Sequence, residues 1–226
     1  AVVTVLGPRN GKYAYDGTPN LMPGSNIPMA ALGAWILWLG WFGFNGGSEL
    51  KVSEVSSATA VSQVFLNTNL AAAGGVLAAM FMSLAATGKM DVTMAINGAI
   101  AGLVSITADP LSPSAGTAVI VGAIGGAIVY ASIVFLEKAG IDDPVGAISA
   151  HGTVGIWGVL VVSLTGGASF GGQLIGVLMI AGFTYLASLG TILAINKVMP
   201  IRASDAEQEA GLDISEVGIE AYPEFK

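Results

Sequence analysis

The chain of 226 residues contains no cysteine, a single histidine and few charged residues. Without cysteine it can form neither a disulfide framework nor a thiolate metal site. Charged residues make up 10% of the chain, whereas an ordinary soluble domain has about 25%. The eight Lys and Arg residues form no basic stripe that would neutralise phosphates, so no nucleic-acid partner is expected.

Motifs typical of enzymes are also missing. One histidine cannot build a zinc site of several histidines, there is no cysteine nucleophile, and the sequence contains neither a P-loop nor an HExxH motif. We therefore expect a protein that is not an enzyme and that holds no metal and no cofactor.

Apolar residues dominate what remains. Hydrophobic residues make up 54% of the chain and the mean hydropathy is +0.75. A helix needs about 20 apolar residues to cross roughly 30 Å of hydrocarbon, and barrel strands are shorter and alternate. We predict an all-α polytopic membrane protein with six transmembrane helices in a membrane domain over 27–199. The helices are expected at about 27–47, 57–87, 91–107, 115–136, 144–165 and 172–198.

The two ends of the chain differ from this domain. Residues 1–26 are interpreted as the end of a preceding span, Val2 to Gly7, followed by a loop, so the chain is expected to be a fragment. Residues 200–226 form an acidic tail with seven Asp and Glu residues between Asp205 and Glu224. Two interpretations of the tail remain open: a disordered acidic end, or a docking segment that packs its few apolar residues on the cytoplasmic face.

Lys and Arg predict which side of the membrane each loop occupies. Six spans place both termini on one side, and that side carries Arg9, Lys12, Lys89, Lys138, Lys197, Arg202 and Lys226. Only Lys51 falls on the other side. Because cytoplasmic loops are enriched in Lys and Arg, we predict a multi-pass protein of the cell membrane, with the termini and the tail in the cytoplasm.

His151 lies in the longest uncharged region, which runs from Pro144 to Asn196. An ionisable residue within a membrane span is a functional hypothesis by default, although a structural histidine bonded to neighbouring helices remains an alternative. A neutral imidazole has one donor and one acceptor nitrogen, so in a narrow apolar lumen it can pass a small polar molecule. Gly152 and Gly155 would let a helix or a permeant approach closely.

The residues before His151 predict the start of its helix. Asp142 and Asp143 carry carboxylates suited to the positive end of a helix dipole, and Pro144 is suited to a first helical turn.

Aromatic residues gather near the end of the first expected span, in Gly40-Trp-Phe-Gly-Phe-Asn-Gly-Gly-Ser48. An interfacial aromatic belt explains many such clusters. A belt does not require the glycines, however, and Asn45 needs a hydrogen-bond partner inside the apolar region. Aromatic faces also attract cations, so a cation-recognition vestibule is the second interpretation.

Four motifs in order resemble the ammonium transporter (Amt/Mep/Rh) family. They are the 40–48 segment, Asp142-Asp-Pro144, His151-Gly-Thr-Val-Gly-Ile-Trp-Gly158 and the tail residues Gly211-Leu-Asp-Ile-Ser215 with Glu220-Ala-Tyr222. The family has eleven spans in two inverted halves, and this chain resembles spans six to eleven. The resemblance implies a homotrimer that transports ammonium or ammonia, and also methylammonium, through a hydrophobic pore in each subunit. It also implies a PII-type regulatory protein at the cytoplasmic face.

The resemblance assigns roles to individual residues. His151 matches the second of two pore histidines, and Phe44 matches the inner of two phenylalanines that gate the pore. Ser48 matches a hydroxyl that recognises ammonium at the outer vestibule. Near the pore, structural roles are expected for Asn45, Gly152, Gly155 and Asp143. The first pore histidine, the second gate phenylalanine and the vestibule tryptophan have no match in this chain. An ammonium sensor of the same fold and a non-conducting structural membrane protein are the alternative functions.

Overall fold

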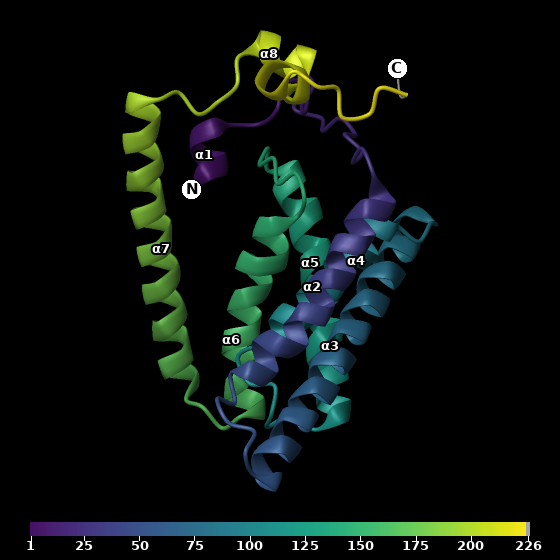
Figure 1. Ribbon diagram of the computed structural model, residues 1–226, viewed down its shortest axis with the longest axis vertical. Coiled ribbons are helices and arrows are strands. Elements are labelled where there is room, and N and C mark those ends of the chain that lie inside the picture. The colour runs from purple at the N-terminus through teal and green to yellow at the C-terminus, as the bar shows by residue number, and fades with distance from the viewer. Residues whose placement is uncertain (225–226) are drawn as a thin grey trace. The chain divides into compact units, whose positions relative to one another are not determined.

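The computed structural model describes residues 1–224, which form helices joined by loops (Figure 1). The helices are α1 (Val2–Leu6), α2 (Ile27–Gly47), α3 (Val55–Thr87), α4 (Val92–Ile106), α5 (Ala115–Lys138), the π-helical turn η1 (Ile148–Thr153), α6 (Val154–Thr165), α7 (Phe170–Val198), α8 (Asp205–Ala210) and a second π-helical turn, η2 (Asp213–Val217). No β-strand occurs within residues 1–224. The predicted all-α class is confirmed.

Five helical segments are long and apolar enough to cross a membrane: α2, α3, α5, η1 with α6, and α7. The segment predicted over 91–107 is the shorter apolar helix α4, with 15 residues. At about 1.5 Å per residue it is roughly 22 Å long, which is less than the roughly 30 Å of a hydrocarbon core. The chain is thus a multi-pass membrane protein in which one apolar helix is short.

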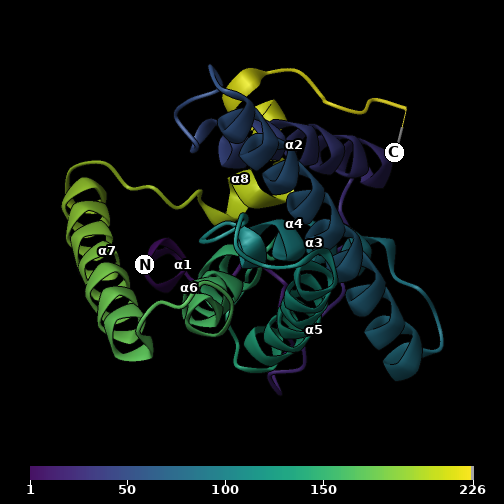
Figure 2. The same ribbon diagram turned by 90° about the horizontal axis from the view of Figure 1, so that it is seen from below.

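The chain divides into two compact units. The first comprises 1–22, 138–142 and 181–226, and the second comprises 23–137 and 143–180. In the second unit α4 contacts α2, α3, η1 and α6 (Figure 2). The short helix is therefore the centre of this unit.

Local sequence signals explain where these helices begin and end. The Asn26 side chain accepts a hydrogen bond of 2.8 Å from the backbone N–H of Met29 at the start of α2, as a helix cap does. The Asp91 carboxylate accepts one of 2.7 Å from the N–H of Thr93 at the start of α4. α3 ends at Gly88, whose φ of 74° is left-handed and favours glycine.

Glycines bring α3, α4 and α5 into direct backbone contact. A side chain at Gly75 of α3 would collide with the backbone at Gly98 and Gly102 of α4. A side chain at Gly126 of α5 would also collide with the backbone of Gly75. Membrane helices commonly pack through glycines, because the absence of a side chain lets two helix backbones come into contact. Gly75, Gly98, Gly102 and Gly126 thus form packing seams between these three helices.

Within the first unit, Asp142 binds Arg9 rather than starting a helix. The Arg9 guanidinium donates two hydrogen bonds of 2.8 Å to the two carboxylate oxygens, and the Arg9 backbone N–H donates a third of 3.0 Å. These hydrogen bonds, and to a lesser extent the positive charge of Arg9, hold the pKa of Asp142 below its usual range. The predicted helix-start role of Asp142 is therefore wrong, because an ion pair with a residue far away in sequence takes up its carboxylate.

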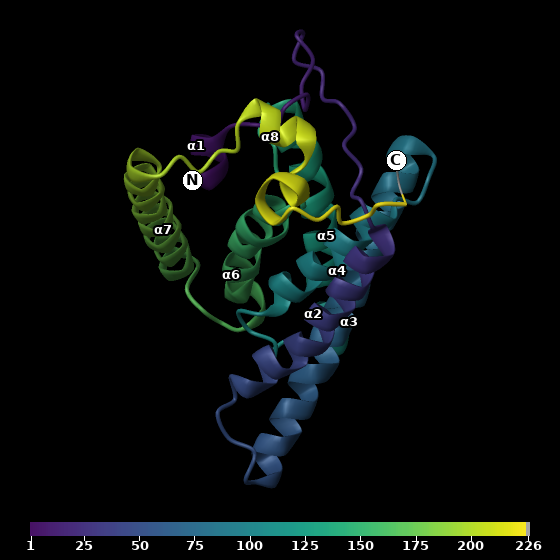
Figure 3. The same ribbon diagram turned by 45° about the horizontal axis from the view of Figure 1, so that its top comes forward.

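The described part of the tail also lies in the first unit. It contains α8 and η2 (Figure 3), and α8 begins with a reciprocal capping box between Ser204 and Glu207. Asn10 donates a hydrogen bond of 2.8 Å to Asp205, and the Arg202 guanidinium donates one of 2.7 Å to the carbonyl of Leu6. The tail is thus held to residues 6–10 by polar contacts. Its apolar residues Leu212, Ile214, Val217 and Ile219 are exposed in this structure, so the predicted apolar packing stays a prediction.

The Asp142 ion pair predicts how stability depends on pH. The pKa of Asp142 is lower in the folded protein, so its contribution is complete above the unfolded value of about 3.9 and is lost as pH falls through the folded value. Asp142→Asn should lower stability by about 1 kcal/mol at neutral pH, because the Arg9 side chain remains 42% exposed and water screens the pair. Melting temperatures measured between pH 7 and pH 3 would test this. The variant should melt below the native protein at pH 7, and its melting temperature should fall less steeply toward pH 3.

Glu209→Gln is the matched control for this measurement, because Glu209 is an exposed carboxylate of α8. Its melting curve should follow that of the native protein at each pH. An unchanged melting temperature for Asp142→Asn at pH 7 would show that the Arg9 contact contributes nothing to stability.

Candidate pore-lining site

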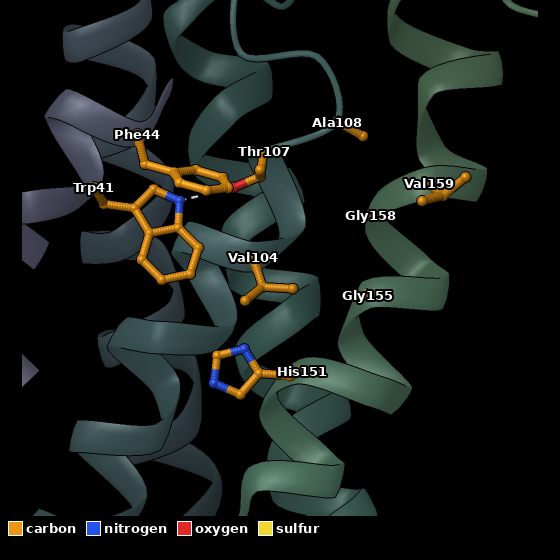
Figure 4. A pocket seen from close by; sticks show the side chains of 9 residues that line it. All are labelled: Trp41, Phe44, Val104, Thr107, Ala108, His151, Gly155, Gly158 and Val159. Carbon is orange, nitrogen blue, oxygen red and sulfur yellow. Dashed lines mark hydrogen bonds between the residues drawn. The ribbon is translucent and has the colours of Figure 1, made fainter. Parts of the chain in front are cut away.

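An open, largely apolar pocket of about 400 Å³ lies among α2, α4, η1 and α6. Figure 4 shows its lining side chains, with the His151 imidazole and the Trp41 and Phe44 rings directed into one space. The complete lining is Trp41, Phe44, Val104, Thr107, Ala108, His151, Gly155, Gly158 and Val159. The few polar groups in an apolar wall suit a site that orients a small molecule.

The helix spacing places the aromatic wall. Trp41 and Phe44 are three residues apart on α2 and therefore share one face. Their ring centroids lie 5.7 Å apart with the planes inclined by 53°, as is common for aromatic pairs. The two rings form one continuous surface opposite α6 (Figure 4).

A hydrogen bond across two helices holds the indole of Trp41 in place. Its Nε1 donates to the Thr107 hydroxyl at 2.8 Å, and this hydroxyl donates in turn to the Leu103 carbonyl at 2.6 Å. The hydroxyl proton and the indole N–H are thus both used within the protein. The rings of Trp41 and Phe44 therefore present mainly carbon to the pocket.

His151 comes from the π-helical turn at the start of the α6 segment. Its side chain is exposed to the pocket, below Val104 in Figure 4. The pocket thus carries one titratable side chain beside aromatic and aliphatic carbon. Such a group can donate or accept a hydrogen bond to a molecule in the pocket.

The structure gathers some of the predicted site residues and separates others. His151, Phe44 and Gly155 line the pocket, whereas Ser48, Asn45, Gly152 and Asp143 do not. Ser48 lies one turn beyond Phe44, and its hydroxyl donates a hydrogen bond of 2.9 Å to the Phe44 carbonyl. Asn45 is buried behind the aromatic wall and donates 2.9 Å to the Thr68 hydroxyl of α3. The amide nitrogen of Asn45 thus has a partner, whereas its buried Oδ1 has none among the described residues.

The helix that carries His151 begins later than predicted. Its first turn starts at Ile148 rather than at residue 144, and Pro144 lies in the preceding loop. Asp143 serves this start, because its carboxylate accepts a hydrogen bond of 3.2 Å from the Ser149 backbone N–H. One of the two predicted carboxylates therefore stabilises the helix start.

Sequence reasoning missed Trp41, Thr107 and Val104 as pocket residues. The i, i+3 spacing of Trp41 and Phe44 would have placed the tryptophan on the same face as Phe44. No comparable signal exists for Thr107 or Val104, because their place in the pocket depends on how α4 packs between α2 and α6.

Comparisons with known proteins agree with this arrangement. A family model described as Ammonium Transporter Family matches residues 1–222. The chain belongs to the ammonium transporter family. The ammonium transporter Amt2 of Archaeoglobus fulgidus is 41% identical over 246 residues, which cover 100% of this chain and 52% of that protein. The Amt2 protein of Methanocaldococcus jannaschii is 38% identical and the match covers 98% of this chain and 52% of that protein.

Solved structures of the family share the fold. A structure titled Sensor Amt Protein superposes with a TM-score of 0.88 at 34% identity, covering 95% of this chain and 55% of that one. Mep2 of Candida albicans superposes with a TM-score of 0.79 at 26% identity, covering 97% and 53%. The chain thus spans about half the length of the family members it matches.

Proposed function

We propose that the protein to which this chain belongs transports ammonium or ammonia, and also methylammonium, across the membrane. The observation that supports this proposal most directly is the pocket that holds His151 and Phe44 together in an otherwise apolar wall. Such a wall is a poor solvent for an ion, because an unpaired charge in a low dielectric costs many kcal/mol. A neutral molecule with hydrogen-bonding atoms meets no such penalty.

The residues suggest a sequence of physical steps. Ammonium is recognised at the outer end of α2, where Ser48 supplies a hydroxyl and aromatic faces attract a cation. Water and one proton are left behind as the substrate passes Phe44, the inner gate. The resulting ammonia then exchanges hydrogen bonds with the imidazole of His151, which takes the role of the second pore histidine.

The finer features of this proposal rest on the family membership and on the distribution of charge. The six-helix membrane domain over 27–199 lies in the cell membrane, and the tail over 200–226 lies in the cytoplasm. Seven of the eight Lys and Arg residues of the whole chain fall on this cytoplasmic side. The assembly is a homotrimer, and a PII-type regulatory protein binds at the cytoplasmic face. Asn45, Gly152 and Asp143 support the pore from outside the pocket, and Gly155, which lines it, leaves room for the substrate.

Transport is tested with the full-length protein in proteoliposomes. An inward ammonium gradient should produce uptake well above that of protein-free liposomes, with much less response to potassium, because the apolar wall does not replace the hydration shell of a permanent ion. Labelled methylammonium should compete with ammonium. Uptake no faster than in protein-free liposomes would refute the proposed function.

An ammonium sensor is the second candidate, because one of the similar structures is titled Sensor Amt Protein. A sensor would bind ammonium and change conformation without passing it. The two functions separate in one preparation: flux together with binding indicates a transporter, whereas ammonium-dependent quenching of the Trp41 fluorescence without flux indicates a sensor. The absence of both responses would indicate a structural membrane protein.

A further inference from the structure

A cluster of three hydroxyls joins α5 to the turn that carries His151. Ser132 of α5 donates a hydrogen bond of 3.0 Å to the hydroxyl of Ser149, and it lies 3.0 Å from the hydroxyl of Thr153. Ser149 is wholly buried and Ser132 is 9% exposed. Because Ser132 has one proton to give, Thr153 is the donor in the second bond. Ser132 is thus the shared centre of the cluster.

Such a cluster is unusual among the hydroxyls of the membrane helices. Ser105, Ser163 and Thr191 each donate to a carbonyl of their own helix, which is the common solution for Ser and Thr in an apolar setting. Ser149 and Thr153 instead reach a neighbouring helix. Their bonds therefore fix the position of the turn relative to α5.

The turn itself departs from an α-helix. Residues Ile148–Thr153 are π-helical, and the N–H of Val154 points to the Ser149 carbonyl five residues back. Isolated π-helical turns are rare and frequently occur at functional sites. The backbone N–H of Ser149 is also held by Asp143 at 3.2 Å. Ser149 is therefore fixed by both its main chain and its side chain.

The spacing relates this cluster to the direction of the imidazole. Ser149 and Thr153 are four residues apart, so they lie on one face of the turn, and His151 lies about half a turn from both. When the two hydroxyls bind Ser132, the side chain between them must point away from α5. Figure 4 shows the imidazole directed toward Val104 and into the pocket.

We propose that Ser132 is a positioning residue, which holds the π-helical turn through Ser149 and Thr153 and thereby aims His151 into the pocket. Ser132 does not contact the substrate. This proposal deepens the proposed function. Only the flux measurement below rests on that function, because the imidazole spectrum does not require transport. Its direct consequence is a change in the environment of the His151 ring whenever the cluster is broken.

The first measurement is the ¹⁵N spectrum of the imidazole in histidine-labelled protein, with the His151 signals assigned by their absence in His151→Ala. Ser132→Ala leaves the partly buried donor Thr153 and the buried acceptor Ser149 without their partner, so the ring signals should shift and broaden. Ser132→Thr keeps the hydroxyl and should restore the native signals. Ammonium flux at saturating substrate should fall about tenfold in Ser132→Ala, the loss expected from one buried hydrogen bond, and should recover in Ser132→Thr.

Ser105→Ala is the matched control, because Ser105 is also buried, at 1% exposure against 9% for Ser132, but among the described residues its hydroxyl bonds only to Ala101 of its own helix at 2.7 Å. It should leave the His151 signals in place. Thr153→Val removes one bond at nearly constant volume and should shift the signals in the same direction as Ser132→Ala, by less. It serves as the deciding variant if Ser132→Ala does not fold.

The outcomes separate the two proposals. His151 signals that stay unchanged in both Ser132→Ala and Thr153→Val, or that move as far in Ser105→Ala, overturn the positioning role even when the native protein transports ammonium. Shifted signals in a protein whose native form passes no ammonium uphold the positioning role and refute the proposed transport.

Discussion

Replacing His151 with alanine in the full-length protein should lower ammonium flux about tenfold or more and reduce the discrimination of ammonium over potassium. The imidazole is the one titratable side chain in the lining of the pocket. Its loss leaves a passing molecule without a hydrogen-bond partner at that depth, which costs about 1–3 kcal/mol, and about 1.4 kcal/mol corresponds to a factor of ten in rate. Flux into proteoliposomes under opposing ammonium and potassium gradients measures both quantities.

Ile156→Ala is the control for this substitution. Ile156 lies on α6 near His151 in sequence, is 42% exposed and does not line the pocket. Its truncation should leave flux and selectivity close to native values. If His151→Ala retained both the native uptake rate and the native discrimination, the pore role assigned to His151 would be incorrect.

The second large effect concerns stability. Gly126→Ala should destabilise the protein by about 3 kcal/mol, at the upper end of the usual cost of overpacking. The added carbon would collide with the backbone of Gly75 on α3, and backbone atoms cannot move aside as a flexible side chain can. The expected result is a clear drop in melting temperature in detergent and a low yield of folded protein.

Gly116→Ala is the matched control, since Gly116 lies on the same helix and nothing occupies the space beside it within 4 Å. Alanine has a higher helix propensity than glycine, so this variant should melt at the native temperature or slightly above it. Equal melting temperatures for the two variants would mean that α3 and α5 do not approach each other as closely as described.

Much of the fold could be predicted from the sequence. Long uncharged runs bounded by charges and by Gly/Pro clusters are spanning helices because a bilayer offers no other partner for the backbone. The ends of the helices could be predicted less well. Pro144 suggested a helix start, but the helix begins at Ile148, because Asp143 reaches forward to Ser149 and Asp142 is bound to Arg9.

The candidate site was predictable only in part. His151 was conspicuous as the single histidine in an uncharged region, and Phe44 belonged to a recognisable motif. Trp41 and Thr107 join the pocket through a hydrogen bond between residues 66 positions apart. No local pattern predicts such a bond, because it exists only once α2 and α4 have packed together.

By itself, the sequence determined the class of this protein, its succession of helices and its family. The length of apolar run that a bilayer requires and the order of the motifs can both be read along the chain. Only the tertiary structure decided how His151 is presented. The π-helical turn and the three hydroxyls of Ser132, Ser149 and Thr153 come from two helices, and the wall that faces the imidazole comes from two more. The direction of a side chain is set by whatever packs behind it, and that is a property of the assembled helices.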